Sequence, residues 1–270
     1  YRRSPAPKVD PEIINKIAES AVNFATNQKY EGAGTIEFIY DVDEKKFYFL
    51  EMNTRIQVEH PVTESITNSD LVEMQINFAL GIDLDLAEQK KINRTGHAIE
   101  CRLYAEDPSK NFLPSPGKIS KLKIPNVNMT NIRLDIGVDE GDEISFYYDP
   151  MIAKIISKGS NRTESINNMV KYLKEFEIEG ISTNKSFLIS VLQSKTFEEA
   201  NFNTKFIENN LTSFIKQKED ILPAKQQDKT KIKQEYSDND IKAFEKIISK
   251  TPKSKNGQGY TEKDLKAFDN

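Results

Sequence analysis

The chain has 270 residues, of which 37% are hydrophobic and 30% are charged. This length suffices for one large or two ordinary domains, and the apolar fraction can build a sizeable core, so we expect a soluble globular protein. The formal net charge is −4, with Lys and Arg spread among acidic residues. This pattern argues against nucleic acid or an anionic membrane as a partner.

Cysteine content and the N-terminus bear on the compartment. Cys101 is the only cysteine, which excludes an internal disulfide framework and a cysteine-based zinc site. We interpret it as a small core residue rather than a nucleophile, which fits a reducing compartment. The chain begins at Tyr1, with no signal peptide, transit peptide or membrane-spanning run. We interpret this start as a cut or missing end, so that any targeting sequence would lie upstream.

The first predicted elements are a helix and a β-hairpin. An Asp-Pro pair precedes apolar residues at helical spacing, which predicts a helix over about 11–27. Two strands, 35–41 and 47–53, should follow and pair through the polar turn 42–46.

The expected register of this hairpin places two carboxylates opposite each other. If the five-residue loop closes the hairpin, the facing pairs are Asp41 with Phe47, Ile39 with Phe49, and Glu37 with Glu51. Facing like charges destabilise a sheet, so a positive group should lie between them. Together with Asn53 they offer hard oxygen ligands, which suit magnesium with waters or phosphate oxygens completing its shell. The alternative is that one carboxylate is protonated or faces solvent.

A polar–apolar alternation runs through residues 51–61, whose sequence is Glu-Met-Asn-Thr-Arg-Ile-Gln-Val-Glu-His-Pro. In an extended chain this alternation creates one polar face, made of Glu51, Asn53, Arg55, Gln57 and Glu59. Arg55 could bind a planar anion such as bicarbonate, and Glu59 could accept a proton from it. A fully extended span from Glu51 to Glu59 would cover about 26 Å, so the chain should bend after Asn53. The alternative is a solvated edge strand.

A helix and a strand are predicted next. The helix should be capped by Thr67 or Asn68 and ended by Gly81, with an inward face of Leu71, Met74, Gln75, Phe78 and Ala79. The strand 98–104 should place Glu100 and Arg102 on one face and Ile99, Cys101 and Leu103 on the other. Arg102 could hold a developing negative charge in an acceptor molecule, and the alternative is a surface ion pair with Glu100.

The remaining sequence predicts a second layer of short strands and helices. Strands are expected at 118–124, 131–136 and 143–157, the last one broken at Asp149-Pro150. Helices should open at Asn161 or Thr163, at Thr183, and around 204–211.

The C-terminal part changes in composition. Residues 213–235 are rich in Lys, Gln and Asp, which predicts a linker. The tail 236–270 contains a short repeat, in which the pattern that starts at Tyr236 recurs from Tyr260. Each copy predicts a short helix, so the tail is either a pair of docking peptides or a marginally ordered extension.

Five motifs resemble the biotin carboxylases, the ATP-grasp ligases of acetyl-CoA, propionyl-CoA, methylcrotonyl-CoA and pyruvate carboxylases. The most specific one reads Phe49-Leu-Glu-Met-Asn-Thr-Arg-Ile-Gln-Val-Glu-His-Pro-Val-Thr-Glu64. The others occupy residues 30–38, 96–108, 112–117 and 147–154, and the resemblance runs from about residue 4 to 211. Residues 104–108 and 141–143 look closest to the α subunits of propionyl-CoA and methylcrotonyl-CoA carboxylases.

This resemblance implies an α+β fold of two parts. The C-terminal portion of an ATP-grasp domain, with antiparallel strands plus helices, would span 1–82. A biotin carboxylase C-terminal α+β domain would span 83–212, followed by the linker 213–235 and the short repeated helical tail 236–270. Neither the glycine-rich lid and ATP-holding lysines of the family nor its Ala-Met-Lys-Met biotinylation motif occurs in this sequence. We therefore interpret the chain as a C-terminal fragment that is inactive alone.

The resemblance also implies a metal and nucleotide site. Glu37, Glu51 and Asn53 would hold the magnesium or manganese ion of MgATP. Glu37 and Glu51 would thereby contribute to binding of the nucleotide.

The same resemblance implies the residues that handle the other substrates. Arg55, Gln57 and Val58 would bind bicarbonate, and Glu59 would deprotonate it. ATP would activate bicarbonate as carboxyphosphate, which yields carbon dioxide for the ureido nitrogen of biotin. Arg102 would bind biotin and stabilise its enolate.

Partners and alternatives follow from the same comparison. The complete enzyme would work with a biotin carboxyl carrier domain and a carboxyltransferase subunit, as a homo- or hetero-oligomer, in the mitochondrial matrix of a eukaryote or in a bacterial cytoplasm. One alternative is another bicarbonate-using ATP-grasp ligase, such as a carbamoyl-phosphate synthetase, although the Arg102 strand and the second domain argue against it. The other is a truncated, non-catalytic partner or scaffold protein that retains the fold.

Overall fold

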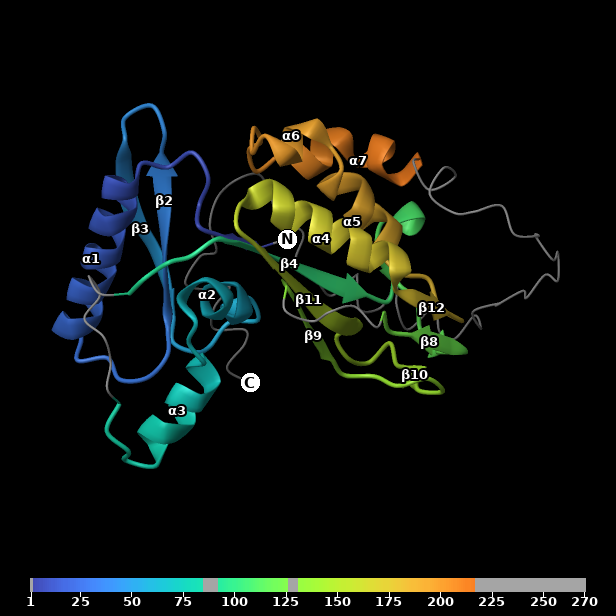
Figure 1. Ribbon diagram of the computed structural model, residues 1–270, viewed down its shortest axis with the longest axis horizontal. Coiled ribbons are helices and arrows are strands. Elements are labelled where there is room, and N and C mark those ends of the chain that lie inside the picture. The colour runs from blue at the N-terminus through green and yellow to red at the C-terminus, as the bar shows by residue number, and fades with distance from the viewer. Residues whose placement is uncertain (1, 85–91, 126–130, 217–270) are drawn as a thin grey trace, which may run out of the picture. The chain divides into compact units, whose positions relative to one another are not determined.

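The computed structural model describes residues 2–84, 92–125 and 131–216 (Figure 1). The predicted tail 236–270 and most of the linker 213–235 lie outside the described residues. Those residues combine helices with antiparallel strands, as predicted (Figure 1). Among their helices, none has the length and apolar character needed to span a lipid bilayer.

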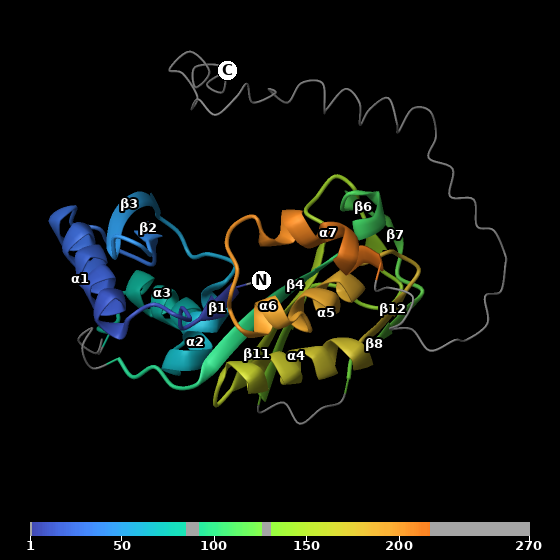
Figure 2. The same ribbon diagram turned by 90° about the horizontal axis from the view of Figure 1, so that it is seen from above.

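The N-terminal part consists of a helix packed beside a hairpin. Helix α1 (Pro11–Asn27) has the predicted bounds, and the Asp10 carboxylate caps it by accepting a hydrogen bond from the Glu12 amide at 2.9 Å. Strands β2 (Thr35–Asp41) and β3 (Lys46–Asn53) form the two-stranded sheet beside α1 (Figures 1 and 2).

The hairpin loop is one residue shorter than predicted. The Asp41 carboxylate accepts hydrogen bonds from the backbone amides of Asp43 and Glu44, both at 2.9 Å, and this tightens the turn. Asp41 therefore pairs with Lys46, so the predicted pairs Asp41–Phe47 and Ile39–Phe49 are wrong.

A β-bulge restores the predicted pairing farther along the hairpin. Phe38 pairs with Phe49, the register then shifts, and Glu37 pairs with Glu51. The extra residue on β3 is Leu50, since two strands of unequal residue count can face each other only through such a bulge. The two carboxylates therefore face each other, as predicted, but for a different reason.

Helix α2 (His60–Thr67) was not anticipated from the sequence. It contains Pro61 in its first turn and ends at Asn68, which adopts a left-handed conformation with φ of 54°. With only eight residues, it is too short to show a clear helical period next to an alternating segment.

Helix α3 (Leu71–Ala79) differs from its prediction at its start and on its inward face. Its cap is Asp70, which accepts a hydrogen bond from the Glu73 amide at 2.8 Å, rather than Thr67 or Asn68. Phe78, predicted to face inward, is 47% exposed.

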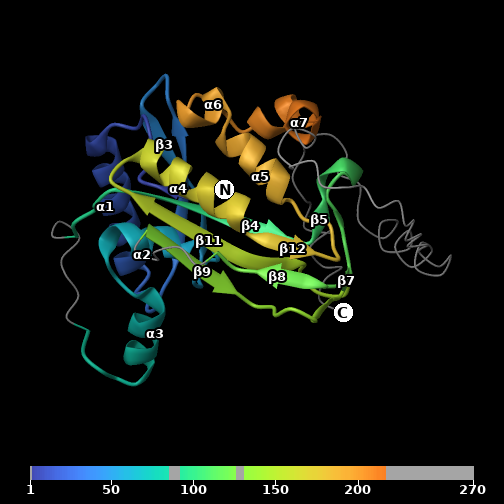
Figure 3. The same ribbon diagram turned by 45° about the vertical axis from the view of Figure 1, so that its right-hand side comes forward.

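A four-stranded antiparallel sheet forms the centre of the second part (Figure 3). Its spatial order is β1 (Arg2–Ser4), β4 (His97–Tyr104), β11 (Met151–Gly159) and β9 (Ile132–Ile136). The alternation predicted for β4 is confirmed on its apolar side, where Ile99, Cys101 and Leu103 are fully buried. Burial raises the pKa of the Cys101 thiol to about 12, as expected for a core residue.

Helices cover the face of the sheet to which those apolar residues point. Helices α4 (Arg162–Glu175) and α5 (Lys185–Leu192) contact the sheet, and α6 (Lys195–Glu198) and α7 (Phe206–Lys216) pack against α5 (Figure 3). Asn161 caps α4, as predicted, whereas α5 begins after Asn184, one residue later than the predicted cap Thr183. The main core lies between this sheet and these helices, with buried side chains that include Met169, Leu173, Phe176, Leu188 and Leu192.

Two of the predicted strands, 118–124 and 143–157, are each divided into shorter strands in the structure. The backbone amides of Ile119 and Ser120 donate to the carbonyls of Asp142 and Glu179 at 2.8 and 2.9 Å. Gly117–Lys118 pair with Glu143–Ile144, whereas Lys121–Lys123 pair with Glu177–Glu179 in a different sheet, so the predicted strand 118–124 is divided into two short strands. The elements here are β5 (Glu106–Asp107), η2 (Pro108–Lys110), β6 (Leu113–Pro114), β7 (Gly117–Lys118), β8 (Lys121–Lys123), β10 (Glu143–Ile144) and β12 (Glu177–Glu179).

Helix α2 packs on the opposite face of the sheet. Val62 and Ile66 of α2 form a second small core with Ala98 of β4 and Ile156 of β11, and all four are at most 6% exposed. This contact fixes α2 against the strand that carries Glu100 and Arg102.

The substitution Ile66→Ala should lower the free energy of unfolding by about 2–5 kcal/mol, because it leaves a cavity at a residue that is 2% exposed. Urea denaturation of the 270-residue chain measures this loss. Ile76→Ala in α3 is the matched control, since Ile76 is 56% exposed and its loss should stay within about 0.5 kcal/mol. Equal losses in the two variants would contradict the role of this small core.

Candidate functional site

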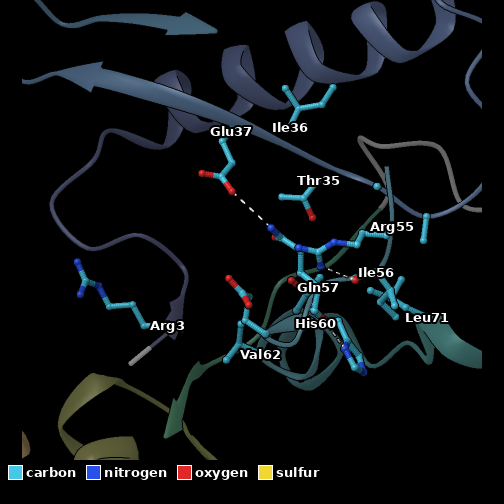
Figure 4. Close-up of a pocket in the computed structure, with 14 residues that line it drawn as sticks. Arg3, Thr35, Ile36, Glu37, Arg55, Ile56, Gln57, His60, Val62 and Leu71 are labelled. Atoms are coloured by element: carbon cyan, nitrogen blue, oxygen red, sulfur yellow. Dashed lines mark hydrogen bonds between the residues drawn. The ribbon is translucent and has the colours of Figure 1, made fainter. Parts of the chain in front are cut away.

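A cavity of about 760 Å³ collects four of the predicted site residues (Figure 4). Glu37 comes from β2, while Arg55, Gln57 and Glu59 come from the segment between β3 and α2. Strand β3 ends at Asn53, where the chain was expected to bend. Gln57 then returns to the hairpin, and its Nε2 donates to Glu37 Oε1 at 3.4 Å.

The facing carboxylates share one amide. Asn53 Nδ2 donates to Glu37 Oε1 at 3.1 Å and to Glu51 Oε1 at 3.2 Å. The partly positive amide group thus occupies the place where a positive partner was expected. Two carboxylates and an amide oxygen suit a hard cation that keeps waters or phosphate oxygens as its other ligands. Across the described ranges, no group of three or more His, Cys, Asp or Glu side chains could hold a metal by itself.

A short turn sets the position of Glu59. The Gln57 carbonyl accepts hydrogen bonds from the His60 backbone amide at 3.2 Å and from His60 Nδ1 at 2.7 Å. Glu59 directly precedes the first residue of α2, so the docking of that helix determines where its carboxylate lies.

Glu59 contacts Arg102 across a long separation in sequence. Arg102 Nη2 donates to Glu59 Oε2 at 2.5 Å, which joins the segment before α2 to strand β4. Arg102 Nε lies 3.6 Å from Glu100 Oε1, so the alternative ion pair is also present. Because Glu100 is fully buried, that pair is not a surface pair.

The backbone around Arg102 is held by a residue that the sequence did not single out. Asn184 Nδ2 donates to the Arg102 carbonyl at 3.2 Å, and Asn184 Oδ1 accepts from the Tyr104 amide at 3.0 Å. Asn184 is 6% exposed, so this clamp lies in a protected environment. The only sequence signal was its place beside a predicted helix start.

Glu100 is the most perturbed acid near the site. Burial raises its pKa to about 7, although the positive charges of Lys154 and Arg102 act in the opposite direction. Neither of its carboxylate oxygens has a hydrogen-bond partner within the described part of the chain. Burial also lowers the pKa of Arg102, but Tyr104 and the charge of Glu59 outweigh this and raise it overall.

A second group of charges anchors α2 to the sheet. Glu64, at 6% exposure, accepts from the Leu71 amide at 2.7 Å and from Arg133 Nη1 at 2.6 Å. Arg133 also binds Asp135 with hydrogen bonds of 2.8 and 3.0 Å, and Asp135 lies 3.2 Å from Lys154. Sequence reasoning missed this network because its members are separated by long stretches of chain.

Of the other predicted site residues, Arg55 lines the cavity and Val58, Glu51 and Asn53 do not. Arg55 is exposed, and its Nη1 donates to the Ile56 carbonyl at 3.2 Å. Asn53 nevertheless reaches the cavity wall through its hydrogen bond to Glu37.

The raised pKa of Glu100 predicts a pH-dependent stability. The ordinary pKa of a glutamate is 4.5 and the folded value is about 7. Between these values the folded chain keeps a proton that the unfolded chain releases, so stability falls as pH rises from about 4.5 to 7.

Urea denaturation at several pH values checks this expectation. Relative to Glu100→Gln, the wild-type chain should lose stability over that interval and then change no further with pH. Ser157→Ala, which alters a buried neutral residue of β11, should shift stability by the same amount at every pH. Parallel curves for the wild type and Glu100→Gln would contradict the assignment.

Comparison with protein families gives two matches that divide the chain. Residues 2–87 match the family described as carbamoyl-phosphate synthase L chain, ATP binding domain. Residues 100–209 match the biotin carboxylase C-terminal domain. Glu59 lies in the first matched region and Arg102 in the second.

Curated relatives agree with these matches. Biotin carboxylase 1 of Bacillus subtilis is 49% identical over 205 residues, which are 76% of this chain and 45% of that protein. The mitochondrial propionyl-CoA carboxylase alpha chain of Homo sapiens is 45% identical over 76% of this chain and 28% of that protein. The chain thus spans less than half the length of these relatives.

A solved structure shares the fold. The biotin carboxylase domain of the Hydrogenobacter thermophilus 2-oxoglutarate carboxylase, in complex with MgADP, ADP and bicarbonate, superposes with a TM-score of 0.74 at 39% identity. The match covers 78% of this chain and 46% of that one.

Proposed function

We propose that this chain is part of a biotin carboxylase and that its cavity is part of a site for ATP- and bicarbonate-dependent carboxylation of biotin. In this proposal the complete protein is an ATP-grasp ligase. This chain contributes the metal-binding carboxylates, the bicarbonate-binding segment and the guanidinium that faces biotin.

The contact between Glu59 and Arg102 carries the proposal. The two residues lie in the two different matched regions, yet their side chains meet at 2.5 Å beside the cavity. A carboxylate that accepts a proton and a guanidinium that stabilises an anion are the two groups that carboxyl transfer to a weakly acidic nitrogen needs. Their contact also explains how a base on one region can act beside an acceptor held by the other.

We assign Glu37, Glu51 and Asn53 to the metal. The carboxylates face each other across the hairpin, and rotation of the Asn53 amide would present Oδ1 in place of Nδ2. A magnesium or manganese ion held by these residues would bind phosphate oxygens of ATP and offset their negative charge, while ATP itself would donate the phosphoryl group that activates bicarbonate. The protein's own part is to hold the two carboxylates at a fixed separation, which the hairpin pairing does.

We assign the segment after β3 to bicarbonate. Arg55 lines the cavity from an exposed position, and its planar fork of donors matches a planar oxyanion. Gln57 is oriented by Glu37, and Val58 lies between Gln57 and the base Glu59. Glu59 takes the proton of bicarbonate, and the adjacent Arg102 donates a hydrogen bond from Nη2 to Glu59 Oε2.

The proposed complete protein has more parts than this chain. The ATP-grasp portion 1–82 and the C-terminal domain 83–212 would be completed by an N-terminal half, a biotin carboxyl carrier domain and a carboxyltransferase subunit. The curated relatives support this, since they include alpha subunits of acyl-CoA carboxylases. The 270-residue chain by itself should therefore not turn over.

Reconstitution tests the activity. The chain is combined with the part of Bacillus subtilis Biotin carboxylase 1 that precedes the matched region, and bicarbonate-dependent ATP cleavage with biotin is measured. Glu59→Gln should lower kcat by about 10²–10⁴-fold, as loss of a general base does. Arg102→Ala should lower it by about 10²–10³-fold, as loss of an oxyanion-stabilising group does.

Two controls accompany this assay. Glu44→Gln removes a carboxylate of the exposed hairpin loop and should leave the rate unchanged. The chain without its added N-terminal half should show no turnover, and robust turnover there would contradict the fragment interpretation. Near-normal rates in Glu59→Gln and Arg102→Ala, together with intact circular dichroism spectra, would remove their assigned roles.

The metal assignment is tested on the chain alone. Titration with Mn²⁺ followed by electron paramagnetic resonance should detect one site, weakened by on the order of 10-fold or more in Glu37→Gln and in Glu51→Gln, because each substitution removes a charged oxygen ligand. Glu44→Gln, in the exposed loop of the same hairpin, should bind Mn²⁺ like the wild type. Identical titrations for all four proteins would place the metal elsewhere.

A further inference from the structure

Glu100 is a buried carboxylate for which the proposed reaction has no use. It lies on β4 between Ala98, which packs against α2, and Arg102. Its neighbour on β11 is Ile156, which is 1% exposed and belongs to the small core beneath α2. A carboxylate in such surroundings is destabilising unless a nearby cation compensates for its lost hydration.

The cation that Glu100 meets is Arg102. Glu100 Oε1 lies 3.6 Å from Arg102 Nε, a distance that is too long for a good hydrogen bond but within the range of an ion pair. Lys154 also affects Glu100 electrostatically, but its ammonium group lies 3.2 Å from the Asp135 carboxylate and is engaged there. Lys154 therefore has the larger longer-range electrostatic effect on Glu100, whereas Arg102 is the cation within ion-pair distance of its carboxylate.

The two carboxylates contact different edges of one planar group. Glu100 faces Nε, and Glu59 accepts from Nη2. The donors of a guanidinium point in fixed directions within its plane, so contacts at two of its nitrogens determine its orientation. Hydrogen bonds from Asn184 hold the backbone around Arg102. The contacts with Glu100 and Glu59 therefore restrict the side-chain torsions of Arg102.

We propose that Glu100 is a positioning residue, whose buried carboxylate holds the Nε edge of Arg102 from inside the sheet and directs its Nη end towards Glu59. This inference depends on the proposed function in one respect, which is the role of Arg102 beside biotin. Glu100 itself is fully buried and is not among the residues that line the cavity.

The orientation is tested on the 270-residue chain without any assay of activity. In ¹⁵N-resolved NMR spectra, Glu100→Gln should shift the Arg102 Nε–H signal and accelerate its hydrogen exchange. Glu106→Gln makes the same chemical change on β5, just beyond β4, and should leave that signal unchanged. An Arg102 signal that is the same in the wild type and Glu100→Gln would overturn the proposal.

The reconstituted enzyme tests the consequence for catalysis. Glu100→Gln should lower kcat for biotin carboxylation by roughly 10- to 100-fold with an unchanged KM for ATP, because a misplaced catalytic group costs rate rather than nucleotide affinity. Glu100→Asp keeps the charge on a shorter side chain and should restore part of the loss. It also serves as the second variant if Glu100→Gln folds poorly.

A double-mutant cycle separates positioning from a general structural effect. Arg102→Lys keeps the positive charge but lacks the Nε edge, so Glu100→Gln should cause no further loss of kcat in that background. An equal loss in both backgrounds would overturn the proposal. If the wild-type reconstituted enzyme does not carboxylate biotin at all, the proposed function fails, and the NMR comparison still decides the orientation of Arg102.

Discussion

The packing of α2 against the central sheet is the contact on which the candidate site depends. Val62 and Ile66 bury their side chains against Ala98 and Ile156, and this removes apolar surface from water on the face that also carries Arg102. Glu59 immediately precedes this helix. The position of its carboxylate is therefore set by a hydrophobic contact made one and two turns farther along.

Buried ion pairs add to the apolar contact in holding α2 and Arg102 in position. Glu64 accepts hydrogen bonds from the Leu71 amide at the start of α3 and from Arg133 of β9, so a buried carboxylate ties α2 to a strand two positions away from β4 in the sheet. Breaking such a pair leaves an uncompensated buried charge, which costs more than the pair itself contributes. Glu100 on β4 is a second buried carboxylate of this kind, and its partner is Arg102.

The hairpin of β2 and β3 holds two like charges, Glu37 and Glu51, close together. Strand pairing fixes Glu37 opposite Glu51, and the Asn53 amide bridges them. The pairing of Glu37 with Glu51 and the bridge from Asn53 both depend on the bulge at Leu50. Without the extra residue, the short loop would pair Glu37 with a different residue of β3. A small irregularity of the backbone therefore determines the geometry of the proposed metal site.

The sequence by itself determined those features that depend on neighbouring residues. The bounds of α1, the alternation of β4, the bend after Asn53 and the family motifs can all be read within short windows, since capping and side-chain period act locally. The sequence also placed Glu37 opposite Glu51, although the loop length from which that pairing was predicted was wrong by one residue.

Only the tertiary structure decided which residues from distant segments meet. The contact of Glu59 with Arg102, the Asn184 clamp and the Glu64–Arg133 pair each join segments separated by a long stretch of chain. The burial of Glu100 was equally hidden, because alternation assigns a residue to a face but does not show that α2 covers that face. The helix that covers it is too short to be recognised by its period, so its effect on the site emerges only from packing.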